Sequence, residues 1–125
     1  MATETPKVIA DGPRVRTFAG GAMRDLDINK PDYEGFLSPR VLEAFGRYMH
    51  KHRQMPDGTY RNSDNWQKGI PRDAYMKSLW RHFFDMWKHH RGLAVQESLD
   101  DAICGILFNV MGYYHEVLQD EQVKL

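Results

Sequence analysis

The spacing of apolar residues predicts three long helices in the last two thirds of the chain. Ser38 and Pro39 begin the first, since serine is a preferred N-cap and proline is favoured at the first helical position. Pro71 begins the second helix, and Ser98 caps the third, which runs to about Leu118. In each segment apolar residues recur every three or four positions, as they do on one face of a helix. The chain is therefore predicted to be all-α, a small helical bundle of three main helices.

The apolar faces of these helices are wide, and we expect them to form the core, because an amphipathic helix buries such a stripe against its neighbours. On the first helix the expected core residues are Val41, Leu42, Phe45, Tyr48, Met49 and His52. On the second they are Tyr75, Met76, Leu79, Phe83, Met86 and Trp87. On the third they are Leu99, Ile103, Ile106, Leu107, Val110, Tyr113, Tyr114 and Val117.

The rest of the chain is predicted to be irregular. A short hairpin is expected around the turn at Asp11-Gly12-Pro13, with strands at Lys7–Ala10 and Arg14–Ala19. Residues 22–37 are expected to form a charged loop. Residues 55–70 are expected to form a long ordered loop before the second helix, a kind of segment that often carries function. The predicted organisation is an irregular N-terminal arm at 1–21, a helical domain at 22–118 and a polar C-terminal tail at 119–125.

Composition excludes several classes of protein. With 125 residues, 42% hydrophobic and 27% charged, the chain suits one globular domain rather than a disordered one. Its 17 basic and 17 acidic residues balance, which argues against binding to long nucleic acid, because phosphate backbones select a basic excess. No run of about 18 apolar residues is present to span a membrane, and no signal-peptide pattern is evident. The single cysteine, Cys104, allows no internal disulfide, and the expected location is the cytoplasm.

A polar stripe runs beside the apolar one on the second and third helices. Its residues are Ser78, His82, Asp85 and His89 on the second, and Asp101, Gly105, Asn109, Gly112 and Glu116 on the third. The link between the helices is short, so we expect the two stripes to meet. Glycine inside a helix costs about 1 kcal/mol relative to alanine, so Gly105 and Gly112 indicate close approach of another helix or of a ligand. A symmetric dimer through this face is one form of that contact.

Carboxylates and imidazoles gathered between these helices predict metal-assisted chemistry on an anionic substrate. His82 and Asp85 lie one helical turn apart, and both are assigned as catalytic residues. The assigned metal ligands are Asp85, Glu97, Asp100 and Asp101. Oxygen ligands suit Mg²⁺, and an added imidazole shifts the preference toward Mn²⁺. The alternatives are a polar seam that only aligns two helices, and acidic residues that only favour a helix N-terminus.

Four blocks of the sequence resemble a known family. They are Lys30–Pro39 (KPDYEGFLSP), Ser63–Gly69 (SDNWQKG), Ser78–His82 (SLWRH) and Asn109. These blocks are similar to phage proteins of the dATP/dGTP diphosphohydrolase N-terminal-domain type, which are themselves similar to MazG-like all-α nucleoside triphosphate pyrophosphohydrolases. The resemblance implies an enzyme, often oligomeric, that uses Mg²⁺ to cleave a (deoxy)nucleoside triphosphate to monophosphate and pyrophosphate.

The resemblance is incomplete at the metal site. MazG-like proteins hold their metal with Glu-Glu-x-x-Glu on one helix and Glu-x-x-Asp on the next. Glu97-x-x-Asp100 matches the second half, whereas His82-x-x-Asp85 stands in place of the first. Three functions therefore stay open: a metal-dependent pyrophosphohydrolase, a non-catalytic phage accessory protein that binds a nucleotide or a host protein, or a purely structural helical oligomer.

Candidate substrate contacts follow from the same resemblance and from side-chain chemistry. Cationic groups can pair with phosphates, and aromatic rings can stack on a base. The assigned substrate-binding residues are Lys30, Tyr33, Asn65, Trp66, Lys68, Arg81 and Asn109. The expected partners are a small nucleotide and further copies of the chain, in the host cytoplasm if the protein is phage-encoded.

Overall fold

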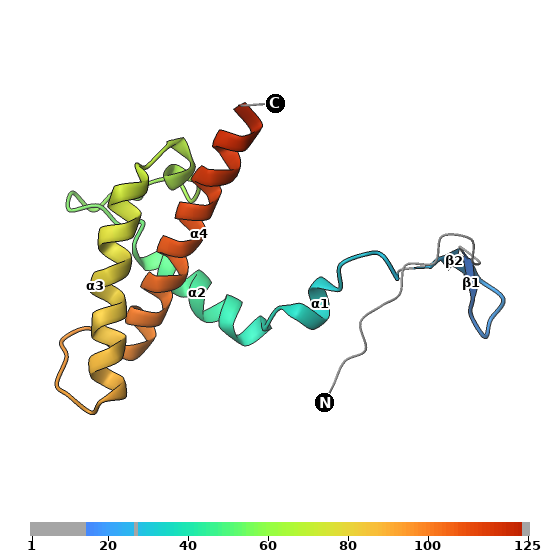
Figure 1. Ribbon diagram of the computed structural model, residues 1–125, viewed down its shortest axis with the longest axis horizontal. Helices are drawn as coiled ribbons and strands as arrows, with labels where there is room; N and C mark the ends of the chain where they lie inside the picture. Colours follow the sequence, from blue (N-terminus) through green and yellow to red (C-terminus); the bar gives the residue numbers. More distant parts are fainter. Residues whose placement is uncertain (1–14, 27, 124–125) are drawn as a thin grey trace. The chain divides into compact units, whose positions relative to one another are not determined.

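The computed structural model describes residues 15–26 and 28–123 of the chain. It divides into two units, Met1–Ser38 and Pro39–Leu125. Most described residues are helical, which confirms the predicted all-α class (Figure 1).

The first unit contains a small hairpin that lies further along the chain than expected. Strands β1 (Val15–Thr17) and β2 (Met23–Asp25) pair antiparallel. Gly21 has a φ of 90° in the connecting turn, a conformation that glycine adopts without steric cost. The expected partner strand Lys7–Ala10 lies outside the described residues. The glycine pair, rather than the Asp-Gly-Pro turn, therefore closes the observed hairpin.

A short helix follows this hairpin. Helix α1 (Tyr33–Phe36) is capped by Asp32, whose carboxylate accepts a hydrogen bond from Gly35 N at 3.1 Å. The prediction of a structureless loop over residues 22–37 is therefore wrong, because this segment holds both β2 and α1. Neither element is long enough to show a hydrophobic period in the sequence.

The second unit is built from three long helices, as predicted. They are α2 (Pro39–Lys51), α3 (Arg72–His90) and α4 (Leu99–Val123). Ser98 Oγ accepts a hydrogen bond from Asp101 N at 3.1 Å and so caps α4. Helices α3 and α4 lie side by side and antiparallel, and α2 also contacts α4 (Figure 1).

Helix α4 extends beyond its expected end at Leu118, through most of the predicted polar tail. An ion pair between Arg72 and Asp120 joins the start of α3 to this last part of α4. Because the pair spans two antiparallel helices, it supports helical structure in a segment whose sequence alone is polar.

The long loop between α2 and α3 is ordered by its own hydrogen bonds. Arg61 N donates to Arg53 O at 2.9 Å, and Arg53 Nε donates to Arg61 O at 2.8 Å, which closes a small hairpin. Gly58, with a φ of 86°, lies at its tip. Asp57 accepts hydrogen bonds from Thr59 N and Oγ1, and these lower the pKa of its carboxyl. A short 3₁₀ helix, η1 (Asn65–Lys68), then packs on α4.

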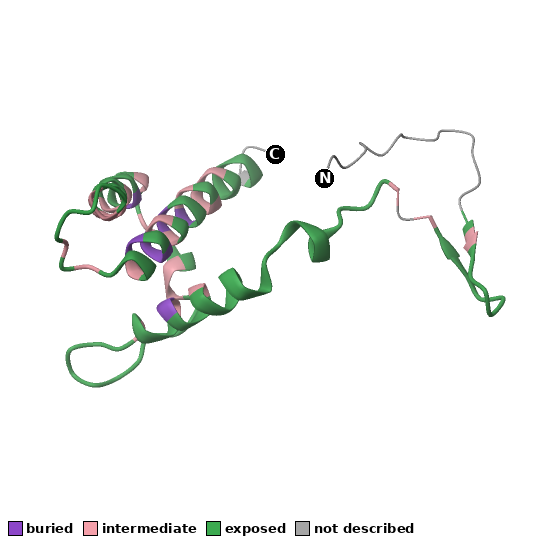
Figure 2. Cartoon of the chain, turned by 90° about the horizontal axis from the view of Figure 1, so that it is seen from below, coloured by how far each residue is buried: buried purple, intermediate pink, exposed green. Residues whose placement is uncertain are grey.

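The buried side of α4 is made of small and polar residues rather than the predicted apolar stripe. The buried residues of α4 are Ala102, Cys104, Gly105, Asn109 and Gly112, and Figure 2 shows buried positions concentrated along this helix. Two glycines in this set allow a close helix contact. The polar stripes therefore face inward in the second unit.

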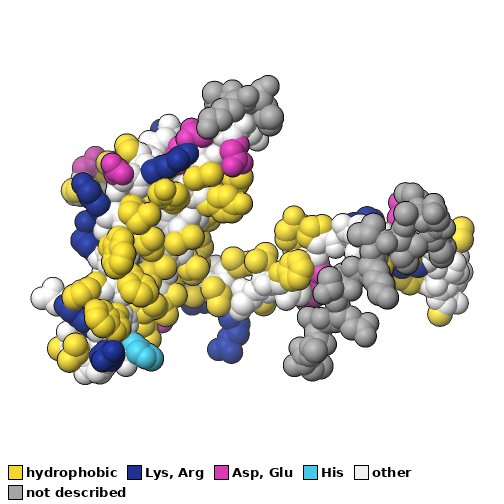
Figure 3. All heavy atoms as spheres, viewed as in Figure 1, with side chains coloured by type: hydrophobic (Ala, Val, Ile, Leu, Met, Phe, Trp, Pro, Cys, Tyr) yellow, Lys and Arg dark blue, Asp and Glu magenta, His cyan; other side chains and the backbone are white. Residues whose placement is uncertain are grey.

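The predicted core is wrong in large part for the same reason. The expected core residues that are exposed instead are Val41, Leu42, His52, Met76, Phe83, Trp87, Leu99, Ile103, Leu107, Val110 and Tyr114. Figure 3 shows hydrophobic side chains gathered on the surface over α3 and α4. Of the predicted core residues, only Tyr48 and Tyr75 are buried, at 8% and 2% exposed.

Candidate functional site

The two polar stripes meet between α3 and α4, as the sequence predicted. A Cβ atom added at Gly105 would lie 2.6 Å from the ring of His82, and one added at Gly112 would collide with the ring of Tyr75. Close helix packing therefore explains both glycines. A dimer through this face is excluded, because α3 already occupies it.

His82, Asp85 and Glu97 form the charged cluster of this seam. His82 Nδ1 lies 2.7 Å from Glu97 Oε1, and both side chains are about one fifth exposed. His89 Nε2 lies 2.7 Å from the backbone oxygen of Glu97 and holds the start of α4 against the end of α3.

The pKa of Glu97 is raised from its ordinary value of 4.5. Burial is the largest cause, the neighbouring Asp85 carboxyl adds to it, and His82 opposes it. Glu97 Oε2 is buried and has no hydrogen-bond partner among the described residues. The Glu97 carboxyl can therefore hold a proton at a higher pH than an exposed glutamate.

The other two predicted metal ligands are engaged differently. Lys51 Nζ on α2 lies 2.7 and 2.9 Å from the two carboxylate oxygens of Asp101, an ion pair that ties α2 to α4. Asp100 is exposed on the first turn of α4. Burial, with smaller contributions from Glu97 and Asp101, raises the pKa of Tyr48 to about 12.

These side chains do not converge on one cation. Within residues 15–26 and 28–123, no group of three or more His, Cys, Asp or Glu side chains is arranged to hold a metal ion. Asp85 and Glu97 lie together, but Glu97 also contacts His82, Asp101 is paired with Lys51, and Asp100 is exposed. The described donor set therefore does not fit a resident Mg²⁺ ion.

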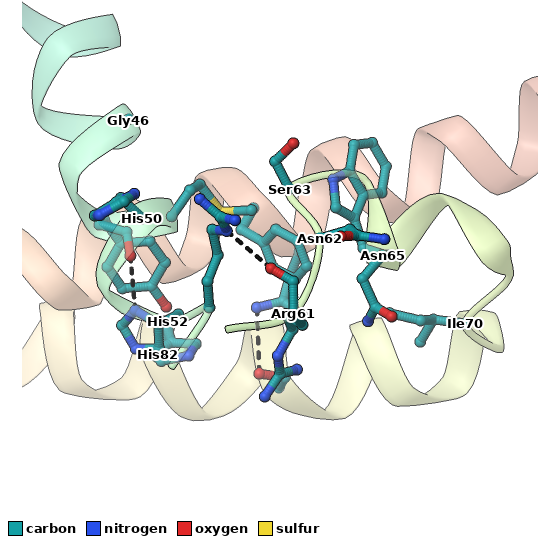
Figure 4. Close-up of a pocket in the computed structure, with 16 residues that line it drawn as sticks. Gly46, His50, His52, Arg61, Asn62, Ser63, Asn65, Ile70 and His82 are labelled. Carbon is teal, nitrogen blue, oxygen red and sulfur yellow. Dashed lines mark hydrogen bonds between the residues drawn. The ribbon is translucent and has the colours of Figure 1, made fainter. Parts of the chain in front are cut away.

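A pocket of about 570 Å³ lies beside this cluster, between α2, the following loop, α3 and α4 (Figure 4). Its lining residues are Gly46, Tyr48, Met49, His50, His52, Arg53, Arg61, Asn62, Ser63, Asn65, Trp66, Ile70, Ser78, His82, Phe108 and Asn109. No carboxylate is among them. The lining therefore contains two arginines, three histidines and three aromatic residues, while the nearby Glu97 carboxylate lies outside it, against His82.

The two ends of the pocket differ in chemistry. Figure 4 shows His50, His52 and His82 at one end, and Asn62, Asn65 and Ile70 at the other. The imidazole end offers ring nitrogens, the asparagine end offers amide donors and acceptors, and Arg53 and Arg61 add positive charge to the lining. The pocket is therefore suited to a ligand with an anionic end and a polar planar end.

Buried polar and aromatic contacts hold the pocket wall. Asn109 is 4% exposed, and its Nδ2 donates to Gly105 O at 2.7 Å and to Ser78 Oγ at 3.2 Å. Trp66 packs edge-on against Phe108 and His115, at centroid distances of 6.1 and 4.9 Å. These contacts attach η1 to α4 and fix the wall before any ligand enters.

The pocket brings together only some of the predicted substrate-binding residues. Asn65, Trp66 and Asn109 line it, as does the predicted catalytic residue His82. Lys68 and Arg81 are exposed and lie outside its lining. Lys30 and Tyr33 belong to the first unit and are described only within that unit.

Sequence reasoning missed the cationic residues of the pocket. They are His50, His52, Arg53 and Arg61. The signal for the arginines was the Pro-Asp-Gly turn at 56–58, since arginines flanking such a turn are brought together when it closes a hairpin.

No family model, curated protein or solved structure matches this chain. Among the described helices, none is both long and apolar enough to cross a membrane. The function is therefore argued from the chemistry of the site itself.

Proposed function

We propose that the protein binds a small anionic ligand of the nucleotide type in the pocket between α2, α3 and α4. The observation that carries the proposal is the lining, which combines Arg53 and Arg61 with imidazoles and aromatic rings and contains no carboxylate. Arginine suits phosphate because its planar donors can bind two oxygens at once. A pocket of this volume is of the size that takes a small organic ligand.

Each part of a nucleotide has a chemical counterpart in the lining. The phosphates would lie near Arg53 and Arg61, whose guanidinium groups carry positive charge. The base would lie near Trp66, which can stack on it, and Asn65, whose amide can hydrogen-bond to it. This arrangement supports the binding function that the sequence left open beside hydrolysis.

Isothermal titration calorimetry with dATP, dGTP, the matching nucleosides and inorganic pyrophosphate tests the proposal. Losing one charge-assisted hydrogen bond costs about 1.5–3 kcal/mol, so Arg61→Gln should weaken triphosphate binding by about tenfold or more. Arg81→Gln is the matched control, because Arg81 is exposed and lies outside the pocket lining. Equal affinity for both variants and the unaltered protein, or no binding at millimolar ligand, would contradict it.

A second candidate function, hydrolysis of the bound nucleotide, is favoured by the position of Glu97. This carboxyl has a raised pKa and contacts His82, which lines the pocket, so it can exchange a proton close to a bound ligand. Release of pyrophosphate from dATP or dGTP should be assayed with added Mg²⁺ and with added Mn²⁺. Activity that disappears in Glu97→Gln while nucleotide affinity is retained would support hydrolysis, and silence with both metals would leave binding alone.

We also propose that the protein works as a homo-oligomer. The support is the set of large apolar side chains that α3 and α4 expose on one side of the second unit. Burial of such surface is a principal driving force for protein association.

A further inference from the structure

One side of the α3–α4 pair is a continuous apolar face. Its residues are Met76, Trp80, Phe83, Phe84 and Trp87 on α3, and Leu99, Ile103, Leu107, Val110, Met111, Tyr114 and Leu118 on α4. On each helix they recur at three- and four-residue intervals and so occupy one sector. Figure 3 shows this face as hydrophobic surface over both helices.

The apolar face points away from the pocket. Helix α4 contacts α2 through Asp101 and packs against Trp66 through Phe108 and His115. At 100° per residue, these three positions lie on the side of α4 opposite Val110 and Ile103. A partner seated on the apolar face would therefore leave the pocket open to solvent.

The size of the apolar face exceeds what an isolated protein usually exposes. Its side chains are between 37% and 65% exposed, and large apolar side chains can each bury about 150–250 Å², so the face offers on the order of 1,000 Å². The largest apolar patch of a typical monomer is roughly 300–600 Å². A standard stable interface buries about 800 Å² on each partner, so the face is large enough for one.

The area of the apolar face fits a second copy of the same chain. In a two-fold dimer the same patch meets itself, so α3 of one copy can lie against α4 of the other. Charged side chains of both signs accompany the apolar positions: Lys77, Arg81 and Asp73 are exposed on α3, and Asp100 and Glu121 are exposed on α4.

We infer that a second copy of this chain packs on the apolar face, with α3 of each copy against α4 of the other. The result is a two-fold dimer with a four-helix core and two outward-facing pockets. This inference rests on the proposed self-association and names its surface. It is independent of whether the pocket binds a nucleotide.

The mass of the full chain in solution tests the dimer. Sedimentation equilibrium at tens of micromolar should give twice the 14.6 kDa of one chain. Phe83→Glu and Val110→Glu should each weaken association by at least a hundredfold, because the charge would be buried in an apolar interface. Met55→Glu is the matched control: Met55 is an exposed apolar residue on the loop hairpin, outside the face, and its substitution should leave the dimer intact.

Three outcomes would overturn the inference. The first is a monomer in the unaltered protein, which is expected if its own first unit or a different protein covers the face. The second is a dimer that neither glutamate variant weakens. The third is a dimer that Met55→Glu weakens as much as the glutamate variants in the face do. Far-UV circular dichroism checks that the variants keep their helices. If Val110→Glu loses them, Val110→Ser takes its place and should still weaken the dimer.

Tryptophan emission gives a second, independent measurement. Trp80 and Trp87 lie in the apolar face, so emission should shift to longer wavelength as dilution separates the copies. No shift across the dissociation would place the interface elsewhere. Nucleotide titration of Phe83→Glu separates the two proposals. If this variant loses nucleotide affinity together with the dimer, the pockets do not face outward. If a monomeric wild-type protein binds nucleotide, the dimer alone is refuted.

Discussion

Replacing Gly112 with alanine tests whether close helix packing holds α3 against α4. An added Cβ collides with the ring of Tyr75, which is only 2% exposed and packs edge-on against Phe108 at 5.8 Å. The ring therefore has little room to move. Overpacking a core costs about 1–3 kcal/mol, and we take the upper end, about 3 kcal/mol, for a contact with a fixed ring. Alanine recovers about 1 kcal/mol of helix propensity, so the net loss in the free energy of unfolding should be about 2 kcal/mol.

Gly46→Ala is the matched control. Gly46 lies within α2, and a Cβ added there meets no atom within 4 Å. This variant should gain about 1 kcal/mol, so the two substitutions should differ by about 3 kcal/mol. Urea unfolding followed by circular dichroism, at one fixed protein concentration, measures both values.

Two results would refute the packing argument. One is Gly112→Ala unfolding at the same urea concentration as the unaltered protein or higher. In a Tyr75→Leu background the colliding ring is absent, so the double-mutant cycle should show strong coupling between the two positions. The other refuting result is a loss in the free energy of unfolding on Gly112→Ala that is the same in this background as in the unaltered protein.

Further predictions concern single groups in the same unit. Tyr75→Phe should raise the free energy of unfolding by about 1 kcal/mol in urea melts, because it removes a buried hydroxyl that has no hydrogen-bond partner among the described residues; a loss of stability would show that the hydroxyl is satisfied. Because the pKa of Glu97 is raised in the folded state, its protonation stabilises the fold below pH 4.5, and this contribution is lost as pH rises through the folded-state pKa. The free energy of unfolding of the wild type relative to Glu97→Gln should therefore fall from pH 4.5 toward neutrality. A constant or rising difference would contradict the burial of this carboxyl. Ser98→Ala should cost about 1 kcal/mol in the same melts, since Ser98 caps α4, and an unchanged midpoint would mean that the cap contributes nothing.

The positions of the three long helices were predictable from the sequence because their signals are local. Pro39 and Pro71 favour helix starts through their fixed φ, and Ser98 supplies a cap oxygen to the backbone three residues on. Each signal acts within one turn of its own helix. The starts of all three helices, and the expectation that the polar stripes meet, were therefore confirmed.

The cationic pocket was not predictable in the same way. Arg53 and Arg61 are eight residues apart and come together because Gly58 allows a tight turn between them. His50 and His82 belong to different helices, and their approach at one end of the pocket depends on how α2 and α3 pack around α4. Such contacts are set by tertiary packing, which a one-dimensional pattern does not contain.

By itself the sequence determined where each long helix begins and which residues share a face, because both follow from backbone geometry and spacing of 3.6 residues per turn. Only the tertiary structure decided which face is inside. An apolar stripe on Phe83 and Val110 predicts burial but does not say against what, whereas Gly105 and Gly112 allow the closest approach of α3 to α4. The polar faces therefore became the contact within one chain, and the apolar faces remained uncovered in the described unit.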